Sequence, residues 1–114
     1  MADNKKKGNL GEKLAADYLE KIGYEIIKTN YRIRNAEIDI IAKKDSVIAF
    51  VEVKYRKTNA LGTPAEAVNG AKQKKIAEAA LAFIAENGDN FDFRFDVCEV
   101  TPLGINYIEN AFWM

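Results

Sequence analysis

The chain has 114 residues, and its 17 basic side chains balance its 17 acidic ones to a formal net charge of zero. A chain of this length forms one domain with its own core, and balanced charge excludes a basic field over the whole surface. The sequence has no histidine and one cysteine, Cys98. These counts exclude histidine-based hydrolases, the usual zinc sites and an internal disulfide, and we expect Cys98 to be a small buried apolar residue.

The composition gives no sign of a membrane segment. No apolar run approaches the roughly 20 residues that a membrane-spanning helix needs. The N-terminus, MADNKKKGN, is polar and basic and lacks the apolar stretch of a secretory signal. We therefore expect a soluble, cytoplasmic protein with no membrane partner.

A first helix is predicted over residues 9–22. Residues 1–8 are predicted to be a flexible N-terminal arm, so the single domain is expected to comprise 9–114. Asn9 is suited to cap the start of the helix, and Gly23 is suited to end it. The residues that recur at helical spacing are Leu10, Leu14, Tyr18 and Ile22, with Gly11 and Ala15.

Three strands are predicted next, over 24–34, 36–42 and 46–56. The sequence KKDS between the second and third strands is typical of a turn, so this pair is predicted to form a hairpin. We expect the turn to be centred on Lys44 and Asp45. Side chains alternate between the two faces of each strand.

A second helix and two further strands complete the pattern. The helix is predicted to begin at Thr63 with Pro64 in its first position and to end at Gly88, and strands follow at 91–100 and 105–112. A helical connection between the third and fourth strands favours a parallel pair. The order predicts an α/β fold with a central mixed sheet of about five strands flanked by helices. The buried positions of the second helix are predicted to be Val68, Ile76, Ala79, Ala80, Phe83 and Ile84.

Charged residues interrupt the apolar pattern of the predicted hairpin. Glu37 and Asp39 lie in one strand, and Glu52 and Lys54 lie in the other. With the turn placed as above, Asp39 pairs with Phe50, and Asp39 and Glu52 become diagonal neighbours on one face, about 7 Å apart. Two carboxylates at this separation can lean onto one divalent cation.

Spacing alone leaves two interpretations of these residues. Unpaired buried carboxylates cost several kcal/mol each, and a divalent cation removes that cost together with their mutual repulsion. Alternatively, the strands end at a solvent-exposed edge, where Lys54 forms a salt bridge with Glu52 or Glu37.

A resemblance to a known family favours the first interpretation. The pattern E-I-D on one strand and E-V-K on the next resembles the signature of the restriction-endonuclease-like, PD-(D/E)xK superfamily. The whole chain resembles the YraN family of uncharacterised bacterial proteins, which share this fold and are related to archaeal Holliday junction resolvases. The matching segments are GNLGEKLAADYLEKIGYEIIKTNYR, AEIDIIAKKDSVIAFVEVKYR, GTPAEAVNGAKQKKIAEAALAFI, RFDVCEV and IENAFW.

The resemblance implies a nuclease that uses Mg²⁺ or Mn²⁺ to hydrolyse phosphodiester bonds of DNA, branched or structured DNA in particular. It implies that Asp39 and Glu52 bind the metal, with the carbonyl of Val53 as a third ligand. It also makes Lys54 the catalytic lysine and Glu12 an additional acid of the resolvase-like site. The implied product has a 5′-phosphate and a 3′-hydroxyl, and the implied assembly is a homodimer. The alternative function is a non-catalytic nucleic-acid-binding module on the same fold.

Further charged residues are candidates for substrate contacts. Lys72 and Gln73 lie on the second helix, where Lys72 matches a lysine position of the family, and Arg56 follows the E-V-K motif. A solvated surface is the structural alternative for each of them. Arg94 and Asp96 are predicted to form a structural ion pair. Glu37 is predicted to support the site or to pair with Lys54.

Overall fold

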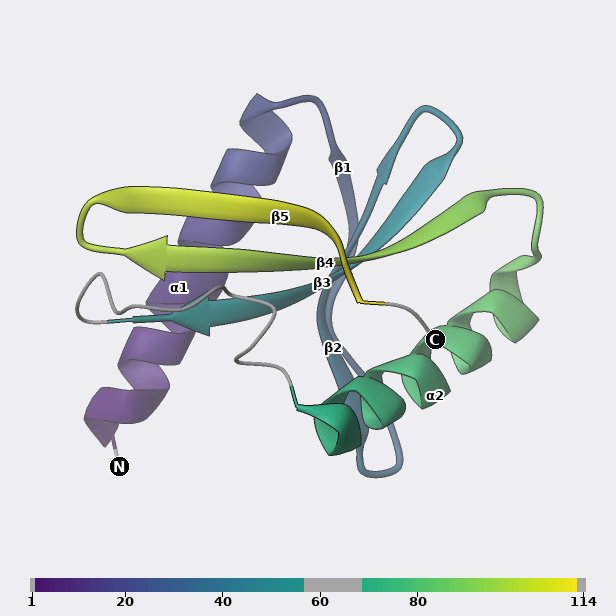
Figure 1. The fold of residues 1–114 in the computed structure, drawn as a ribbon, viewed down its shortest axis with the longest axis horizontal. Coiled ribbons are helices and arrows are strands. Elements are labelled where there is room, and N and C mark those ends of the chain that lie inside the picture. Colours follow the sequence, from purple (N-terminus) through teal and green to yellow (C-terminus); the bar gives the residue numbers. More distant parts are fainter. Residues whose placement is uncertain (1, 57–68, 113–114) are drawn as a thin grey trace.

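The computed structural model describes residues 2–56 and 69–112, and it describes side chains from Leu10 onward (Figure 1). The helices and strands follow one another in the predicted order. The elements are α1 (Ala2–Lys21), β1 (Glu25–Ile33), β2 (Ala36–Lys44), β3 (Val47–Tyr55), α2 (Gly70–Asn87), β4 (Asp92–Thr101) and β5 (Gly104–Phe112).

The five strands form one sheet in the order β1-β2-β3-β4-β5. Strands β3 and β4 are parallel, and the other neighbouring pairs are antiparallel. Helix α2 lies between β3 and β4 in the chain, as the parallel pair requires. The predicted α/β fold, with a mixed five-stranded sheet flanked by helices, is therefore confirmed.

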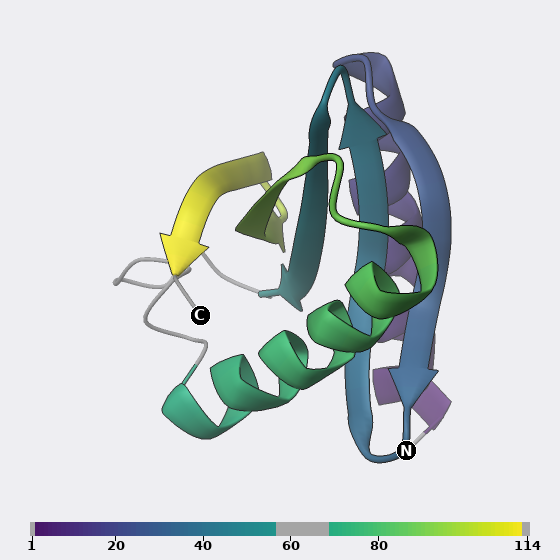
Figure 2. The same ribbon diagram turned by 90° about the vertical axis from the view of Figure 1, so that its right-hand side faces the viewer.

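The two helices cover opposite faces of the sheet (Figure 2). Each face has its own apolar core, so the sheet is buried from both sides at its centre. The core beneath α2 includes Ile38, Ile41, Phe50, Phe83 and Phe95. The core beneath α1 includes Ala15, Leu19, Ile40, Val51 and Cys98.

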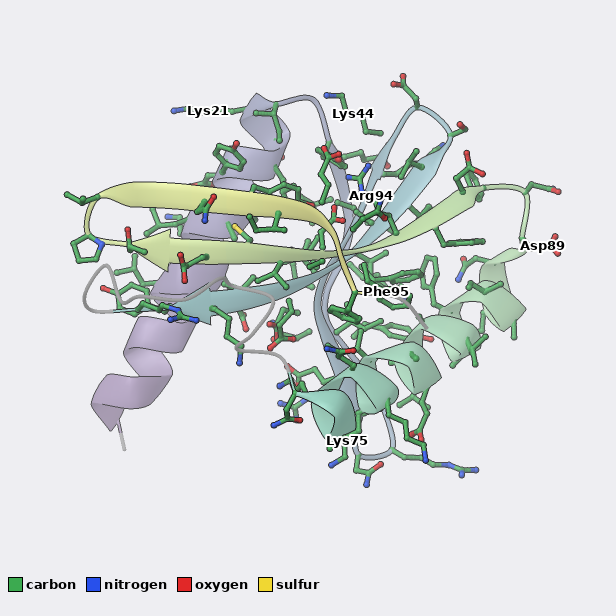
Figure 3. All side chains as sticks on the ribbon, in the orientation of Figure 1. Lys21, Lys44, Lys75, Asp89, Arg94 and Phe95 are labelled. Carbon is green, nitrogen blue, oxygen red and sulfur yellow. The ribbon has the colours of Figure 1, made fainter. Side chains whose placement is uncertain are left out.

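Strand β4 shows how alternation divides the side chains between these faces. Phe95 joins the core beneath α2, and Arg94 lies on the other face, where it donates a hydrogen bond to Tyr24 (Figure 3). Arg94 also donates to Asp96 at 2.8 Å, and this confirms the predicted structural ion pair. Cys98 is buried, as predicted, and burial raises the pKa of its thiol to about 12.

Helix α1 begins earlier than the sequence predicts. It starts at Ala2, so Asn9 is an interior residue and the prediction that it caps the helix is wrong. Flexibility of residues 1–8 stays a prediction. Gly23 ends the helix as predicted: its φ is 100°, and its N–H donates to the carbonyl of Glu20.

The face that α1 presents to the sheet agrees with the predicted one only in part. Leu10 and Leu14 are 49% and 39% exposed, against the prediction. Gly11 and Ala15, the small residues of the predicted stripe, face the sheet, and a Cβ on Gly11 would lie 3.4 Å from the Tyr55 side chain. The small residues let the helix approach β3 closely, and this approach turns the neighbouring leucines outward.

Helix α2 begins at Gly70 with Asn69 as its cap. The predicted start at Thr63 lies outside the described residues, and Gly70 stands at the start of the described helix where the sequence placed it in the middle. The predicted apolar face is confirmed for Ile76, Ala79, Ala80 and Phe83, which are buried. Neither α1 nor α2 combines the length and apolar character needed to cross a membrane.

Candidate functional site

The candidate site lies where β2 and β3 separate. These strands pair from Lys44 with Val47 to Ile40 with Val51, around a turn at Asp45 and Ser46. The predicted turn is therefore one residue too early, and the partner assignments shift by two. Because two is the side-chain period of a strand, the shift keeps Asp39 and Glu52 on a common face. With the observed register, Asp39 and Glu52 are the positions that follow the Ile40–Val51 pair on the two strands.

Beyond Ile40 and Val51, a hydrogen bond to a side chain replaces the backbone hydrogen bonds between the two strands. The N–H of Val53 donates to Asp39 Oδ2 at 2.8 Å. Strand β2 is irregular at this point, since Ile38 and Ile40 belong to the cores on opposite sides of the sheet. Strict alternation would place them together. The interruption turns Asp39 into the gap between the strands.

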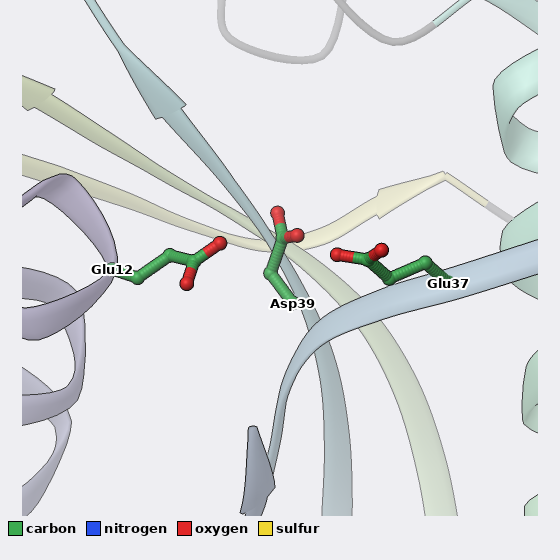
Figure 4. Close-up of side chains that lie close together, drawn as sticks. All are labelled: Glu12, Glu37 and Asp39. Atoms are coloured by element: carbon green, nitrogen blue, oxygen red, sulfur yellow. The ribbon is translucent and has the colours of Figure 1, made fainter. Parts of the chain in front are cut away.

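Three carboxylates converge on this gap (Figure 4). Glu12 reaches it from α1, and Glu37 and Asp39 reach it from β2. One oxygen of each lies within 4.8 Å of the others. The structure thus brings Glu12 to the predicted site, and it places Glu37 in the cluster as well.

Glu52 also neighbours Asp39, and its side chain is only 4% exposed. The two carboxyl groups influence each other: Glu52 lowers the pKa of Asp39 through a hydrogen-bonding interaction, and the charge of Asp39 raises the pKa of Glu52. Two ammonium groups face Glu52 Oε1: Lys72 Nζ at 3.4 Å and Lys54 Nζ at 3.9 Å. Asp39 is therefore common to the pair with Glu52 and to the cluster with Glu12 and Glu37.

The pKa values of these acids reflect burial and mutual repulsion. The pKa of Glu52 is raised to about 7, mainly by burial and then by the charge of Asp39, while Lys72 and Lys54 oppose the increase. Burial also raises the pKa of Asp39, against the effect of the Val53 N–H and Lys72. For Glu12, burial and then Asp39 raise the pKa. Such shifts mark functional sites more often than surface pairs.

Asn30 is a site residue that the sequence analysis missed. Its carboxamide hydrogen-bonds to the Glu12 carboxylate and opposes the increase in its pKa. Its φ is 51°, a left-handed conformation that asparagine tolerates within a strand. The signal was present, because asparagine is uncommon in strand interiors. A cavity of about 200 Å³ beside it is lined by Glu12, Lys13, Ala16, Thr29 and Asn30.

Glu37 forms a different ion pair from the predicted one. It lies 2.6 Å from Arg32 Nε, while Lys54 is paired with Glu52. Of the two roles predicted for Glu37, the described side chains show no pairing with Lys54, and the supporting role beside Asp39 stays a prediction. Arg32 is 72% exposed, so this ion pair contributes little to stability. It does hold the Glu37 carboxylate beside Asp39.

The remaining predicted site residues have distinct positions. Lys72 joins the site through Glu52, and Val53 joins it through its N–H. Gln73 donates its backbone N–H to Asn69 at the start of α2. Arg56 Nε lies 2.6 Å from Glu99, away from the acidic gap. Substrate contacts by these residues, and a metal contact by the Val53 carbonyl, stay predictions.

The donor set fits a hard divalent cation. Oxygens bound to one Mg²⁺ lie at most about 4.2 Å apart, twice the metal–oxygen distance of about 2.1 Å. Carboxylate oxygens that already lie within 4.8 Å need only a small inward movement. Carboxylates and carbonyls are the ligands that Mg²⁺ and Mn²⁺ prefer. A cation could be held by Asp39 with Glu52, or by Asp39 with Glu12 and Glu37, and Asp39 is a ligand in both arrangements.

Comparison with known proteins identifies the family. The model of the uncharacterised protein family UPF0102 matches residues 11–100. A UPF0102 protein of Alkaliphilus metalliredigens is 52% identical over 113 residues, which cover 96% of this chain and 99% of that protein. A UPF0102 protein of Caldicellulosiruptor bescii is 49% identical, over 95% and 98% of the two chains. One of Chlorobium chlorochromatii is 43% identical, over 94% and 91%. The chain therefore belongs to the uncharacterised family UPF0102, the YraN family that its motifs indicated.

Proposed function

We propose that this protein is a nuclease that hydrolyses phosphodiester bonds of DNA with Mg²⁺ or Mn²⁺. The observation that carries the proposal is the environment of Glu52. Its carboxyl is buried against Asp39, and its nearest cations are two lysine ammonium groups at 3.4 and 3.9 Å. Burying acidic groups so close together is unfavourable unless a cation offsets their repulsion.

The cation is assigned to the carboxylates of Asp39 and Glu52, and Glu12 and Glu37 approach Asp39 from two sides (Figure 4). When bound, such an ion polarises a phosphoryl oxygen and lowers the pKa of a coordinated water. Asp39 is held in place by the Val53 N–H, and Glu12 is held by Asn30. These contacts support the positions of the ligands before a substrate arrives.

Lys54 is the proposed catalytic lysine. It follows Glu52 by two positions on β3, and its ammonium lies 3.9 Å from the Glu52 carboxylate. In that position it can stabilise negative charge that develops on the phosphate or orient the attacking water. Its side chain is 29% exposed, so it is accessible to a substrate that approaches the gap.

A cleavage assay tests the proposal directly. Single-stranded, duplex, flap and four-way junction DNA would each be incubated with Mg²⁺, Mn²⁺ or EDTA. We expect cleavage of a branched substrate with either metal and none in EDTA. The Asp39→Asn, Glu52→Gln double variant is the matched control, because it keeps the shape of both side chains and removes their charge. Cleavage by that variant at the parent's rate would locate the chemistry elsewhere or in a contaminant.

The same assay distinguishes the nuclease from the alternative, a non-catalytic binding module. That alternative predicts DNA binding without cleavage under every metal condition. If the parent protein binds junction DNA in a gel-shift assay but leaves all four substrates intact, the binding module becomes the better description.

A further inference from the structure

Lys72 is closer to the buried Glu52 carboxylate than the proposed catalytic lysine is. Its Nζ lies 3.4 Å from Glu52 Oε1, against 3.9 Å for Lys54. Its charge also lowers the pKa of Asp39 as well as that of Glu52. One ammonium group thus acts on both of the residues that are proposed as metal ligands.

The backbone of Lys72 is held by a hydrogen bond, and its side chain is half exposed. The Asn69 side chain accepts the Lys72 N–H at 2.9 Å and caps α2. The Lys72 side chain is 46% exposed, and a lysine has four rotatable bonds with which to turn toward solvent. Its ammonium can therefore leave Glu52 without disturbing the helix.

The charges of α2 oppose the helix dipole. The first turn has no acidic residue and the last turn has no basic residue, while Lys72, Lys74 and Lys75 all lie near the N-terminal end (Figure 3 labels Lys75). Cations are unfavourable at this end of a helix. A nearby anion offsets this unfavourable interaction of the Lys72 charge, and the structure places the Glu52 carboxylate there.

We propose that the Lys72 ammonium is a counter-ion for Asp39 and Glu52 that a divalent cation displaces, and that the displaced lysine then binds a phosphate of the substrate. The inference rests on the proposed function for its cation and its substrate. A divalent ion bound by the same carboxylates repels an ammonium group a few ångströms away. The exposed side chain relieves this repulsion by turning outward, toward the position of an incoming phosphate.

Metal affinity is the first test. Isothermal titration calorimetry with Mn²⁺ would compare the parent with Lys72→Met, Lys72→Arg and Lys75→Met. We expect Lys72→Met to bind Mn²⁺ about three- to tenfold more tightly, a modest gain because solvent screens the half-exposed ammonium. Lys72→Arg keeps the competing charge, and Lys75→Met removes a charge from the same helix away from Glu52. Both should retain the parent's affinity.

Thermal unfolding in EDTA tests the contact without any metal. Lys72→Met would be made in the parent and in a Glu52→Gln background, so that the effect on the helix dipole cancels. We expect the melting temperature to fall by about 2–5 °C more in the parent than in the Glu52→Gln background. An equal change in both backgrounds would show that Lys72 does not act through Glu52.

DNA binding tests the second half of the proposal. In the Lys54→Met background, which should cleave more slowly by about a hundredfold or more, the salt dependence of DNA binding would be measured with Mn²⁺ and with EDTA. Removing Lys72 should reduce the slope by about one phosphate contact with Mn²⁺ and by less in EDTA. An equal reduction under both conditions means that Lys72 binds phosphate whether or not a metal is bound. This result would contradict the proposal that a metal displaces Lys72 from Glu52.

The outcomes separate this inference from the proposed function. If the parent and Lys72→Met bind Mn²⁺ with equal affinity, the exchange is overturned while the nuclease proposal stands. If Lys72→Met binds Mn²⁺ more tightly but the parent cleaves no DNA, the exchange is supported and the nuclease proposal fails. A parent protein that binds no Mn²⁺ overturns both.

Discussion

Two buried carboxylates in neighbouring strands have opposite surroundings. Asp96 of β4 has no exposed surface and accepts hydrogen bonds from three residues: Arg94 at 2.8 Å, the Tyr107 hydroxyl at 2.5 Å and the Asn110 N–H at 3.0 Å. Glu52 of β3 is 4% exposed and faces two ammonium groups at longer distances and a second acid.

The comparison shows that burial alone does not separate structural acids from functional ones. The guanidinium of Arg94, the Tyr107 hydroxyl and the Asn110 N–H satisfy the Asp96 carboxylate with hydrogen bonds, and the hydrogen bond to Asp96 raises the pKa of Arg94. This set of donors leaves no role for a further cation. Glu52 is buried without such a set of donors, so its charged form is unfavourable. A positively charged ligand can supply the stabilisation of the carboxylate that the protein itself lacks.

The largest predicted effect comes from matched amide substitutions at these two sites. Asp96→Asn removes the partner of the partly buried Arg94 and should lower the free energy of unfolding by about 3 kcal/mol. Glu52→Gln removes a charge that the folded state disfavours, so in EDTA it should leave stability unchanged or raise it. Urea denaturation at a pH above 7 measures both. Equal losses from the two substitutions would erase the distinction between the sites.

Replacement of Lys54 tests the catalytic side of the comparison. Lys54→Met keeps most of the side-chain volume and removes the charge. Cleavage should fall about a hundredfold or more, because a group that acts mainly on the transition state is lost. DNA affinity should change by one phosphate contact at most. Single-turnover rates and binding measurements separate the two. An unchanged cleavage rate would remove Lys54 from the mechanism.

Metal linkage is expected to distinguish the acidic gap from the Asp96 cluster. Mg²⁺ or Mn²⁺ should raise the melting temperature, by the equivalent of about 2.7 kcal/mol at a hundredfold excess over Kd. The Asp39→Asn, Glu52→Gln double variant should lose this response. Asp96→Asn should keep it, from a lower starting temperature. Differential scanning calorimetry with and without metal gives the answer, and an equal response from the double variant would place the ion elsewhere.

The strands and the facing acids could be predicted from the sequence, but the register could not. Alternation with a period of two identifies the strands and places Asp39 and Glu52 on one face. The sequence KKDS fits a turn at either of two neighbouring positions. In the structure the turn lies at Asp45 and Ser46, and Asp45 has the left-handed φ of 55° that aspartate tolerates in turns. The error of two residues preserved the face, so the predicted pair remained together.

The missed parts of the site depend on contacts between distant segments. Asn30 and Glu12 are far apart in the chain, and their contact exists because α1 packs closely on the sheet through Gly11 and Ala15. Helical periodicity placed Leu10 and Leu14 on the buried face because it counts apolar residues. It does not take into account how closely the helix can approach the sheet. Small residues gave the better indication of the contact face.

The smallest predicted effect is a pH dependence that originates at Glu52. Its pKa is about 7 in the folded protein and 4.5 ordinarily. Between these values the folded protein keeps a proton that the unfolded chain has released, so stability falls as the pH rises through this window and levels off above it. In EDTA the loss should be on the order of 2 kcal/mol. Urea denaturation across the window measures the slope.

Two variants show whether this slope belongs to Glu52. Glu52→Gln should flatten most of it, and the remainder should come from Asp39 and Glu12, whose pKa values are also raised. Glu78→Gln, which alters an exposed glutamate of α2, should keep the parent's slope. A parent slope that persists in Glu52→Gln would mean that the buried proton resides on another acid. The contrast between Glu52 and Asp96 would then rest on geometry alone.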